Sequence, residues 1–224
     1  MEDLYIPYYI TGIGNSAFRN STNMSSVMIE NGVTSIGKNA FRGCTKLSTV
    51  HLLGNTTNYG EDVFRDCNAL ETVNINSLNE WCNSTFYNAN ANPLTKARQL
   101  SQYGNLQTTI YIPDGVTSIK SFAFYNCSSI QNLTIPESVT SISSTAFTGC
   151  NNLVSVMAKS KTPVSDASTF TNRKNAVLHV PAGSKSAYQI ANYWKEFALI
   201  IDPSSCAVSI GSNNIATYCN TQGL

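Results

Sequence analysis

The feature of this sequence that most constrains its fold is a unit that recurs at intervals of about 23 residues, a period within the range typical of repeat proteins. An Ala-Phe or Val-Phe pair marks the unit at five places, with the same interval between successive pairs among the first three and again between the last two. The pairs are Ala17-Phe18, Ala40-Phe41, Val63-Phe64, Ala123-Phe124 and Ala146-Phe147. A fixed period of this length indicates a repeat architecture, in which each unit stacks on its neighbours.

Other residues keep a constant distance from the phenylalanine of each unit. A cysteine occupies the third position after it in the last four pairs, and Ser21 takes that place in the first. An apolar triplet spaced L-x-x-V-x-I comes next, and its V-x-I part predicts a short strand with Val and Ile inward. Val-Thr-Ser-Ile then appears at three places, and its β-branched residues predict a second short strand on the opposite side of the coil. We therefore expect an α/β-repeat solenoid dominated by short β-strands, a leucine-rich-repeat right-handed superhelix with an irregular insertion and a C-terminal cap.

The period also indicates how far the solenoid extends. We place it at residues 1–201, because Leu4 and Ile6 fall one period before Val27 and Ile29. The period is broken between Val63 and Ala123, and the extra residues lie at about 76–106. This insertion could form a degenerate rung, with Trp81 and Phe86 inward, or a surface bulge that only fills space, and 92–100 could be a short helix.

The carboxyl-terminal part has a different pattern. Leu178-His179-Val180-Pro181 matches Ile110-Tyr111-Ile112-Pro113, and the apolar residues from 182 to 201 then follow a helical period. We expect residues of about 178–201 to cap the stack. Residues 202–224 are a tail or the start of a further module, and 207–210 could be a strand.

The composition argues against several classes of protein. Charged residues are 12% of the chain and the formal net charge is +1, whereas Ser, Thr and Asn together make up about a third. A nucleic-acid binder or a polybasic membrane-surface module needs a surplus of Lys and Arg, so we expect neither. No apolar run is long enough to span a bilayer, and we expect any signal or anchor to lie outside this sequence.

The cysteines and histidines do not predict a catalytic or metal site. None of the seven cysteines forms a C-x-x-C pair, so zinc is not expected, and we predict no metal and no cofactor. Cysteines at one position of adjacent rungs point in parallel, which favours free thiols, and a disulfide between Cys206 and Cys219 stays open. His51 and His179 fall about 25 Å apart at strand spacing, too far to share a metal ion. We expect no enzyme.

The outward residue between the Val and Ile of each strand defines a candidate ligand face. The period places eight residues in this column: Tyr5, Met28, His51, Asn74, Tyr111, Thr134, Met157 and His179. Aromatic residues and methionine are enriched at protein interfaces. Strand exteriors also favour Tyr and Thr for packing alone, so both interpretations stay open.

The full unit resembles the BspA-like leucine-rich-repeat family. The segments Ile36-Gly37-Lys38-Asn39-Ala40-Phe41-Arg42-Gly43-Cys44 and Leu133-Thr134-Ile135-Pro136-Glu137-Ser138-Val139-Thr140-Ser141-Ile142 carry this resemblance, which covers about residues 4–201 and departs at Ser21 and in the third repeat. The insertion and the ending Val180-Pro181-Ala182-Gly183-Ser184 are also similar to bacterial members. The resemblance implies a surface-exposed or secreted bacterial protein with a role in adhesion and no catalytic residues.

We therefore expect a non-enzymatic binding or adhesion module of a bacterial cell-surface or secreted protein. Its partner would be a protein or glycan on host or neighbouring cells, bound by a monomer through the stacked-strand face. The alternative is a structural spacer that presents another domain on the cell surface.

Overall fold

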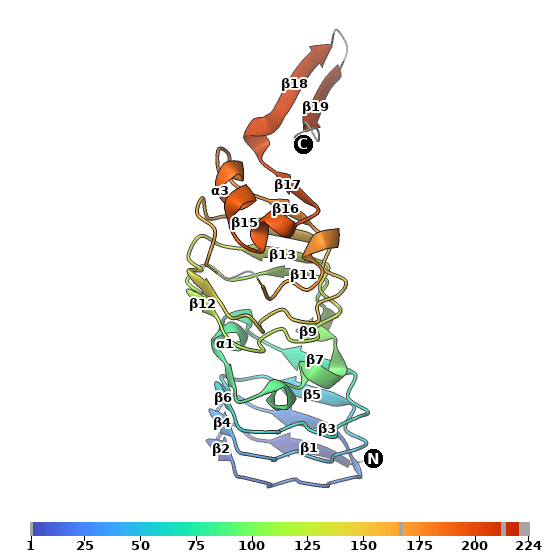
Figure 1. Cartoon of the computed structure of the whole chain (residues 1–224). Coiled ribbons are helices and arrows are strands. Elements are labelled where there is room, and N and C mark those ends of the chain that lie inside the picture. Colours follow the sequence, from blue (N-terminus) through green and yellow to red (C-terminus); the bar gives the residue numbers. More distant parts are fainter. Residues whose placement is uncertain (1, 166–167, 212–213, 220–224) are drawn as a thin grey trace.

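The computed structural model describes residues 2–165, 168–211 and 214–219. The chain winds into rungs that stack in one elongated column, with the amino-terminal strands at one end and a hairpin at the other (Figure 1). Each rung contributes a longer strand to one side of the column and most contribute a two-residue strand to another.

Two parallel sheets form the side of the longer strands. The first has six strands and ends in an antiparallel one: β1 (Glu2–Ile6), β3 (Met24–Ile29), β5 (Thr49–Leu52), β7 (Thr72–Ile75), β9 (Leu100–Gln102) and β10 (Asn105–Leu106). The second has five: β11 (Thr109–Tyr111), β13 (Asn132–Ile135), β15 (Ser155–Ala158), β16 (Val177–His179) and β17 (Leu199–Ile201). The period keeps its register, since Val27 pairs with Val50 and Val50 with Val73, and all three are fully buried.

The short strands form a separate series, as the Val-Thr-Ser-Ile segments predict. A four-stranded sheet contains β2 (Gly12–Ile13), β4 (Ser35–Ile36), β6 (Asn58–Tyr59) and β8 (Thr85–Phe86). A two-stranded sheet contains β12 (Ser118–Ile119) and β14 (Ser141–Ile142). The short-strand prediction is confirmed, whereas the hand of the superhelix stays a prediction.

The core is a stack of aromatic rings that follows from the repeated phenylalanine. Phe41 lies between Phe18 and Phe64, with ring centroids 5.3 and 5.6 Å apart and nearly parallel planes. In the second half, Phe147 lies between Phe124 and Phe170, at 5.0 and 5.4 Å. The phenylalanine ring of each of these rungs therefore packs on the ring of the preceding rung.

The cysteines of three units join their rung to the preceding one. The thiols of Cys44, Cys67 and Cys150 donate to the carbonyls of Phe18, Phe41 and Phe124, each at 3.1 Å. These three cysteines, with Cys82 and Cys127, are buried and free, which confirms the prediction of free thiols for them.

The tight turn between the phenylalanine and the cysteine requires a left-handed backbone. The residue before the cysteine position has a positive φ of 59° at Asn20, 74° at Gly43, 64° at Asp66, 59° at Asn126 and 83° at Gly149. Glycine, asparagine and aspartate tolerate this conformation better than other residues. The variation at this position is therefore restricted to residues that the turn accepts.

The insertion is a true rung rather than a surface bulge. It contains α1 (Leu78–Asn83), β8, the 3-10 turn η1 (Ala89–Ala91), α2 (Leu94–Ala97) and β9. β8 pairs with β6 and β9 pairs with β7, so both series of strands continue through it. Trp81 and Phe86 point inward and are buried, which confirms the degenerate-rung alternative, and the expected helix at 92–100 is the shorter α2.

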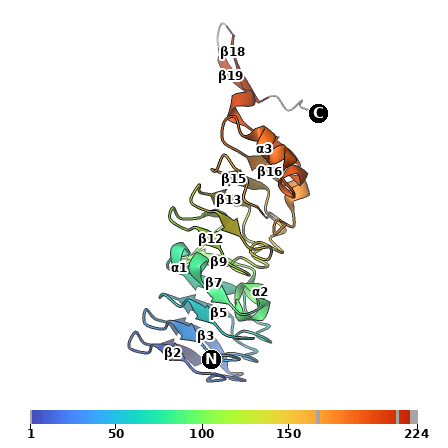
Figure 2. The ribbon, with the colours of Figure 1, turned by 60° about the vertical axis from the view of Figure 1, so that its left-hand side comes forward.

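After the insertion, the strand ladder is interrupted. β10 folds back antiparallel on β9, and β11 starts the second sheet without pairing with either strand. Side chains, together with a backbone hydrogen bond from the Ser129 amide to the Arg98 carbonyl at 3.2 Å, connect the two halves instead. The indole nitrogen of Trp81 donates to the carbonyl of Ala123 at 2.8 Å, and the amide of Asn92 donates to the carbonyl of Phe122 at 2.6 Å. Helix α1 lies next to β12 across this joint (Figure 2).

The carboxyl-terminal segment differs from the single helical stretch expected at 182–201. It forms a short helix α3 (Lys185–Ile190), a 3-10 turn η3 (Trp194–Glu196) and then β17, which pairs with β16. Tyr188, Trp194 and Phe197 are buried, but they lie on three successive segments rather than on one helix, which corrects the expected helical period. The strand forms because backbone pairing with β16 outweighs local helical preference. That residues 178–201 act as a cap stays a prediction.

Two further 3-10 turns, η2 (Arg173–Asn175) and η4 (Pro203–Ser205), complete the described elements before the final hairpin. That hairpin consists of β18 (Cys206–Gly211) and β19 (Asn214–Cys219), and its backbone register sets Cys206 opposite Cys219. The side chains of this segment lie outside the described part of the structure, so the disulfide question is left open.

Candidate functional site

The eight predicted face residues lie in two columns rather than one. In the first sheet, Tyr5 pairs with Met28, Met28 with His51 and His51 with Asn74. In the second sheet, the same relation holds along the series Tyr111, Thr134, Met157 and His179. The expectation of one continuous column is wrong, because the β9–β10 hairpin separates the sheets between Asn74 and Tyr111.

The two columns differ in how much of their surface is available. Tyr5, Tyr111 and Met157 have exposed fractions of 55, 67 and 45%, and the other five residues are half-buried. In the first column the polar groups already have partners. The Tyr5 hydroxyl donates to Glu30 at 3.3 Å, and the Asn74 amide nitrogen lies 3.2 Å from Nδ1 of His51. Loss of hydration and the nearby Glu30 carboxylate raise the pKa of Tyr5.

The structure adds four residues that the period did not indicate. Ser101 and Ile201 continue the two columns in register with Asn74 and His179. Tyr103 and Leu106 lie on the β9–β10 hairpin and are exposed. The hairpin is held at the face by the Gly104 amide, which donates to the Asn74 side chain at 3.0 Å. Gly104 is a turn-favouring residue that could have located this hairpin in the sequence.

An apolar hollow opens at the end of the second column. Its volume is about 350 Å³, and eight residues from three neighbouring strands and the segments that follow them line it. They are Met157, Ala158, Lys159, His179, Val180, Pro181, Ile201 and Pro203. We call it the Met157 hollow. It joins two predicted face residues, Met157 and His179, in one concave surface.

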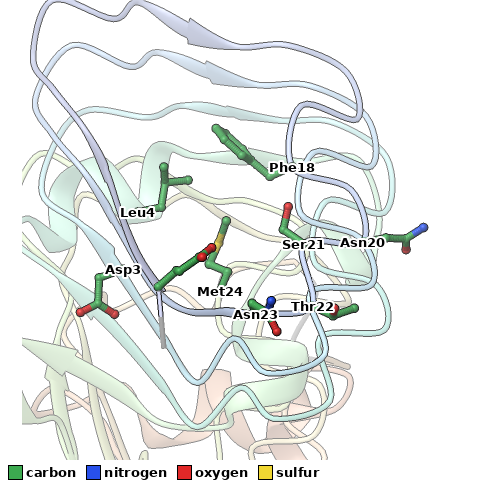
Figure 3. Close-up of a pocket in the computed structure, with 9 residues that line it drawn as sticks. Asp3, Leu4, Phe18, Asn20, Ser21, Thr22, Asn23 and Met24 are labelled. Carbon is green, nitrogen blue, oxygen red and sulfur yellow. The ribbon is translucent and has the colours of Figure 1, made fainter.

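Two other hollows have structural explanations. One, of about 450 Å³, lies at the amino-terminal end of the stack, where Leu4, Phe18 and Met24 lie inside the backbone ring and Asn20 outside it (Figure 3). The other, of about 740 Å³, lies beside the short strands, over a row of glycines. A Cβ on one of these, Gly37, would lie 2.6 Å from the Asn15 nitrogen, so close rung packing requires that glycine.

The buried thiols of Cys82 and Cys127 are held in the protonated form. Burial raises the pKa of Cys82 to about 12 and, opposed in part by a hydrogen bond with Ser129, the pKa of Cys127 to about 11. Both thiols are therefore protonated at neutral pH, and the thiolate is the nucleophilic form. Among the described residues, no group of three or more His, Cys, Asp or Glu side chains is arranged to hold a metal ion. No helix in the described part of the chain is long and apolar enough to cross a membrane.

Solved structures of leucine-rich repeat proteins are similar to this chain. The T. pallidum leucine rich repeat protein is 19% identical, with a TM-score of 0.32 over 86% of this chain and 79% of that one. A leucine rich cell surface protein from Faecalibacterium prausnitzii A2-165 is 16% identical, with a TM-score of 0.28 over 89% of this chain and 87% of that one. The pneumococcal vaccine antigen PcpA is 11% identical, with a TM-score of 0.29 over 88% and 78%.

Among curated proteins, none matches the chain. A family model supplies the assignment: the BspA type leucine rich repeat region matches in 6 copies, over residues 1–106 and 96–193. These matches include every rung from β1 to β16. The chain therefore belongs to the BspA-type leucine-rich repeat family.

Proposed function

We propose that this chain is a non-enzymatic binding module of an extracellular or cell-surface protein, which engages a protein or glycan on a host or neighbouring cell through the stacked-strand face. The observation that carries the proposal is a group of exposed large side chains on the two columns and on the β9–β10 hairpin between them. They are Tyr5, Tyr103, Leu106, Tyr111 and Met157. Aromatic residues and methionine are enriched at interfaces, so their exposure on this face favours a binding surface.

The low charge of the chain indicates which interactions would dominate the expected contact. With 12% charged residues and a net charge of +1, the chain as a whole has little long-range attraction for a partner. The contact would therefore depend on apolar burial and hydrogen bonds, with an association rate that changes little with salt.

Two tyrosines make a matched pair for the experiment. Tyr111 on the strand face and Tyr87 beside the short strands have exposed fractions of 67 and 70%, so alanine removes similar surface from each. The immobilised chain is screened against extracellular-matrix proteins and a glycan array, and each ligand found is measured with both variants. Tyr111→Ala should weaken binding about tenfold or more, as at an interface hot spot, and Tyr87→Ala should leave it unchanged.

Equal effects of the two variants would refute the strand face as the site. Failure to find any ligand would favour the alternative, a structural spacer that presents another domain. On that alternative residues 202–224 would be the beginning of a further module rather than a tail.

A further inference from the structure

We propose that the Met157 hollow is an anchor pocket that accepts one large apolar side chain of a partner protein, placed next to an acidic residue of the same partner. This inference deepens the proposed function and rests on it for the biological partner, but the pocket itself is testable alone.

Two adjacent rows of residues build the hollow. Met157, His179 and Ile201 form the first row, because β15, β16 and β17 pair in register. The second row lies two residues further along the chain on each rung and consists of Lys159, Pro181 and Pro203. Ala158 and Val180 lie between the rows and are buried. The hollow is therefore apolar at its centre, with one imidazole and one ammonium group at its edge.

The backbone around the hollow has few groups left to bond a ligand. The amide of Lys159 donates to the carbonyl of Ile135 and the amide of Val180 to that of Ile201, both at 2.9 Å. Pro181 and Pro203 have no amide hydrogen, and the carbonyl of Pro181 already accepts the Ser184 hydroxyl at 2.6 Å. A polar group that entered the hollow would lose water without gaining a partner, which costs free energy. The group that fits is apolar.

The positive charge of Lys159 at the edge of the hollow favours an acidic residue of the partner next to the bound apolar side chain. Lys159 is exposed and makes no ion pair with any residue that the structure describes. Asp202 is buried, and its carboxylate accepts hydrogen bonds from the amides of Gly183 and Lys185. A carboxylate next to the bound apolar group would therefore have the Lys159 ammonium group as an ion-pair partner.

The size and position of the hollow favour a protein segment as the occupant. About 350 Å³ is at the lower end of the range of ligand pockets, enough for one large side chain and its neighbours. The outward column Tyr111, Thr134 and Met157 leads directly into the hollow. A chain that inserts a side chain there can continue along the strand face, where the exposed Tyr111 supplies further apolar contact.

Methyl NMR of the whole chain, labelled with ¹³C at the methionine and isoleucine methyl groups, tests the pocket with defined peptides. The probes are acetyl-Asp-Phe-Asp-amide, acetyl-Lys-Phe-Lys-amide and acetyl-Asp-Ser-Asp-amide. We expect the Met157 and Ile201 methyl signals to shift on addition of Asp-Phe-Asp, with millimolar affinity, and to shift much less with the other two. Met28, at the equivalent position of the first sheet, is the internal control and should not move.

Charge variants complete the test. Lys159→Glu should weaken Asp-Phe-Asp binding at least threefold and strengthen Lys-Phe-Lys binding. The matched variant Lys161→Glu, at an exposed residue that does not line the hollow, should change both by less than twofold. No shift at Met157 up to ~10 mM peptide, equal shifts with both charged peptides, or equal shifts at Met28 would overturn the pocket.

The two proposals can fail separately. If peptides bind the hollow but no extracellular ligand is found, the pocket stands and the proposed function fails. If an extracellular ligand depends on Tyr111 but the peptides do not shift Met157, the proposed function stands and the pocket fails.

Discussion

Replacing Phe41 with alanine would remove one ring from the middle of the aromatic stack. Phe41 is fully buried and has a ring on each side, Phe18 at 5.3 Å and Phe64 at 5.6 Å. Loss of a buried phenylalanine costs about 3–5 kcal/mol, since apolar burial is lost and a cavity remains. We place Phe41→Ala in the upper half of this range, because stacked rings contribute about 0.5–1.5 kcal/mol per pair beyond burial and two pairs are lost.

Phe18 provides the matched comparison, because it occupies the same position in the first rung. It is half-buried and has one stacked neighbour, Phe41, so only one ring pair is lost on replacement. Phe18→Ala should therefore cost only about 1–2 kcal/mol, since less apolar surface is buried and solvent can fill the gap.

Urea unfolding followed by circular dichroism measures both variants against the parent chain. The midpoint should fall clearly more for Phe41→Ala than for Phe18→Ala, and the slope of the transition should stay constant in both if the repeats unfold together. Equal losses in the two variants would refute the reasoning, because the cost would then not depend on burial and stacking. A near-neutral Phe41→Ala would mean that the ring is not in the core.

Three further changes test other parts of the structure. Gly37→Ala should destabilise the fold by about 1–3 kcal/mol, since the added Cβ would lie 2.6 Å from the Asn15 nitrogen. Gly14→Ala is the control and should be neutral in the same urea assay, because a Cβ at Gly14 would have no atom within 4 Å. Trp81→Phe should cost about 1–2 kcal/mol in thermal unfolding, because the 2.8 Å bond to the Ala123 carbonyl across the joint is lost, and an unchanged midpoint would contradict that role. The free energy of unfolding should fall as pH rises from about 9 to 11, because the Cys127 thiol, with a folded pKa of about 11, stays protonated in the folded state while the unfolded thiol ionises. Cys127→Ala should make this decline less steep by up to about 1.4 kcal/mol per pH unit, and an identical slope in both proteins would refute the assignment.

The repeated positions could be predicted from the sequence because a stacked rung places every residue relative to the one before it. Val27, Val50 and Val73 stand one period apart in the chain, and the same spacing sets their strand register. Inward and outward sides of each strand then follow from alternation, which located the eight outward residues. For this reason these residues are neighbours in register within each sheet, whereas their role as a ligand face stays a proposal.

The positions outside the period depended on contacts between residues far apart in the chain. Trp81 bonds a carbonyl 42 residues away, and this bond helps to join the two halves where the strand ladder stops. No spacing rule indicates such a partner. The β9–β10 hairpin, which divides the face into two columns, likewise depends on the Gly104 amide reaching Asn74, 30 residues earlier.

The period by itself thus determined which side chains are buried and which strands are neighbours, because stacking repeats one local geometry. Only the tertiary structure decided where the strand ladder is interrupted and where the surface of the stack is concave. The Met157 hollow needs Pro181 and Pro203 on successive rungs beside Met157. In this region the interval between rungs is shorter than the regular period, and the strand β17 stands where a helix is expected. Concavity depends on how side chains of different rungs fit together, and a repeat pattern describes each rung alone.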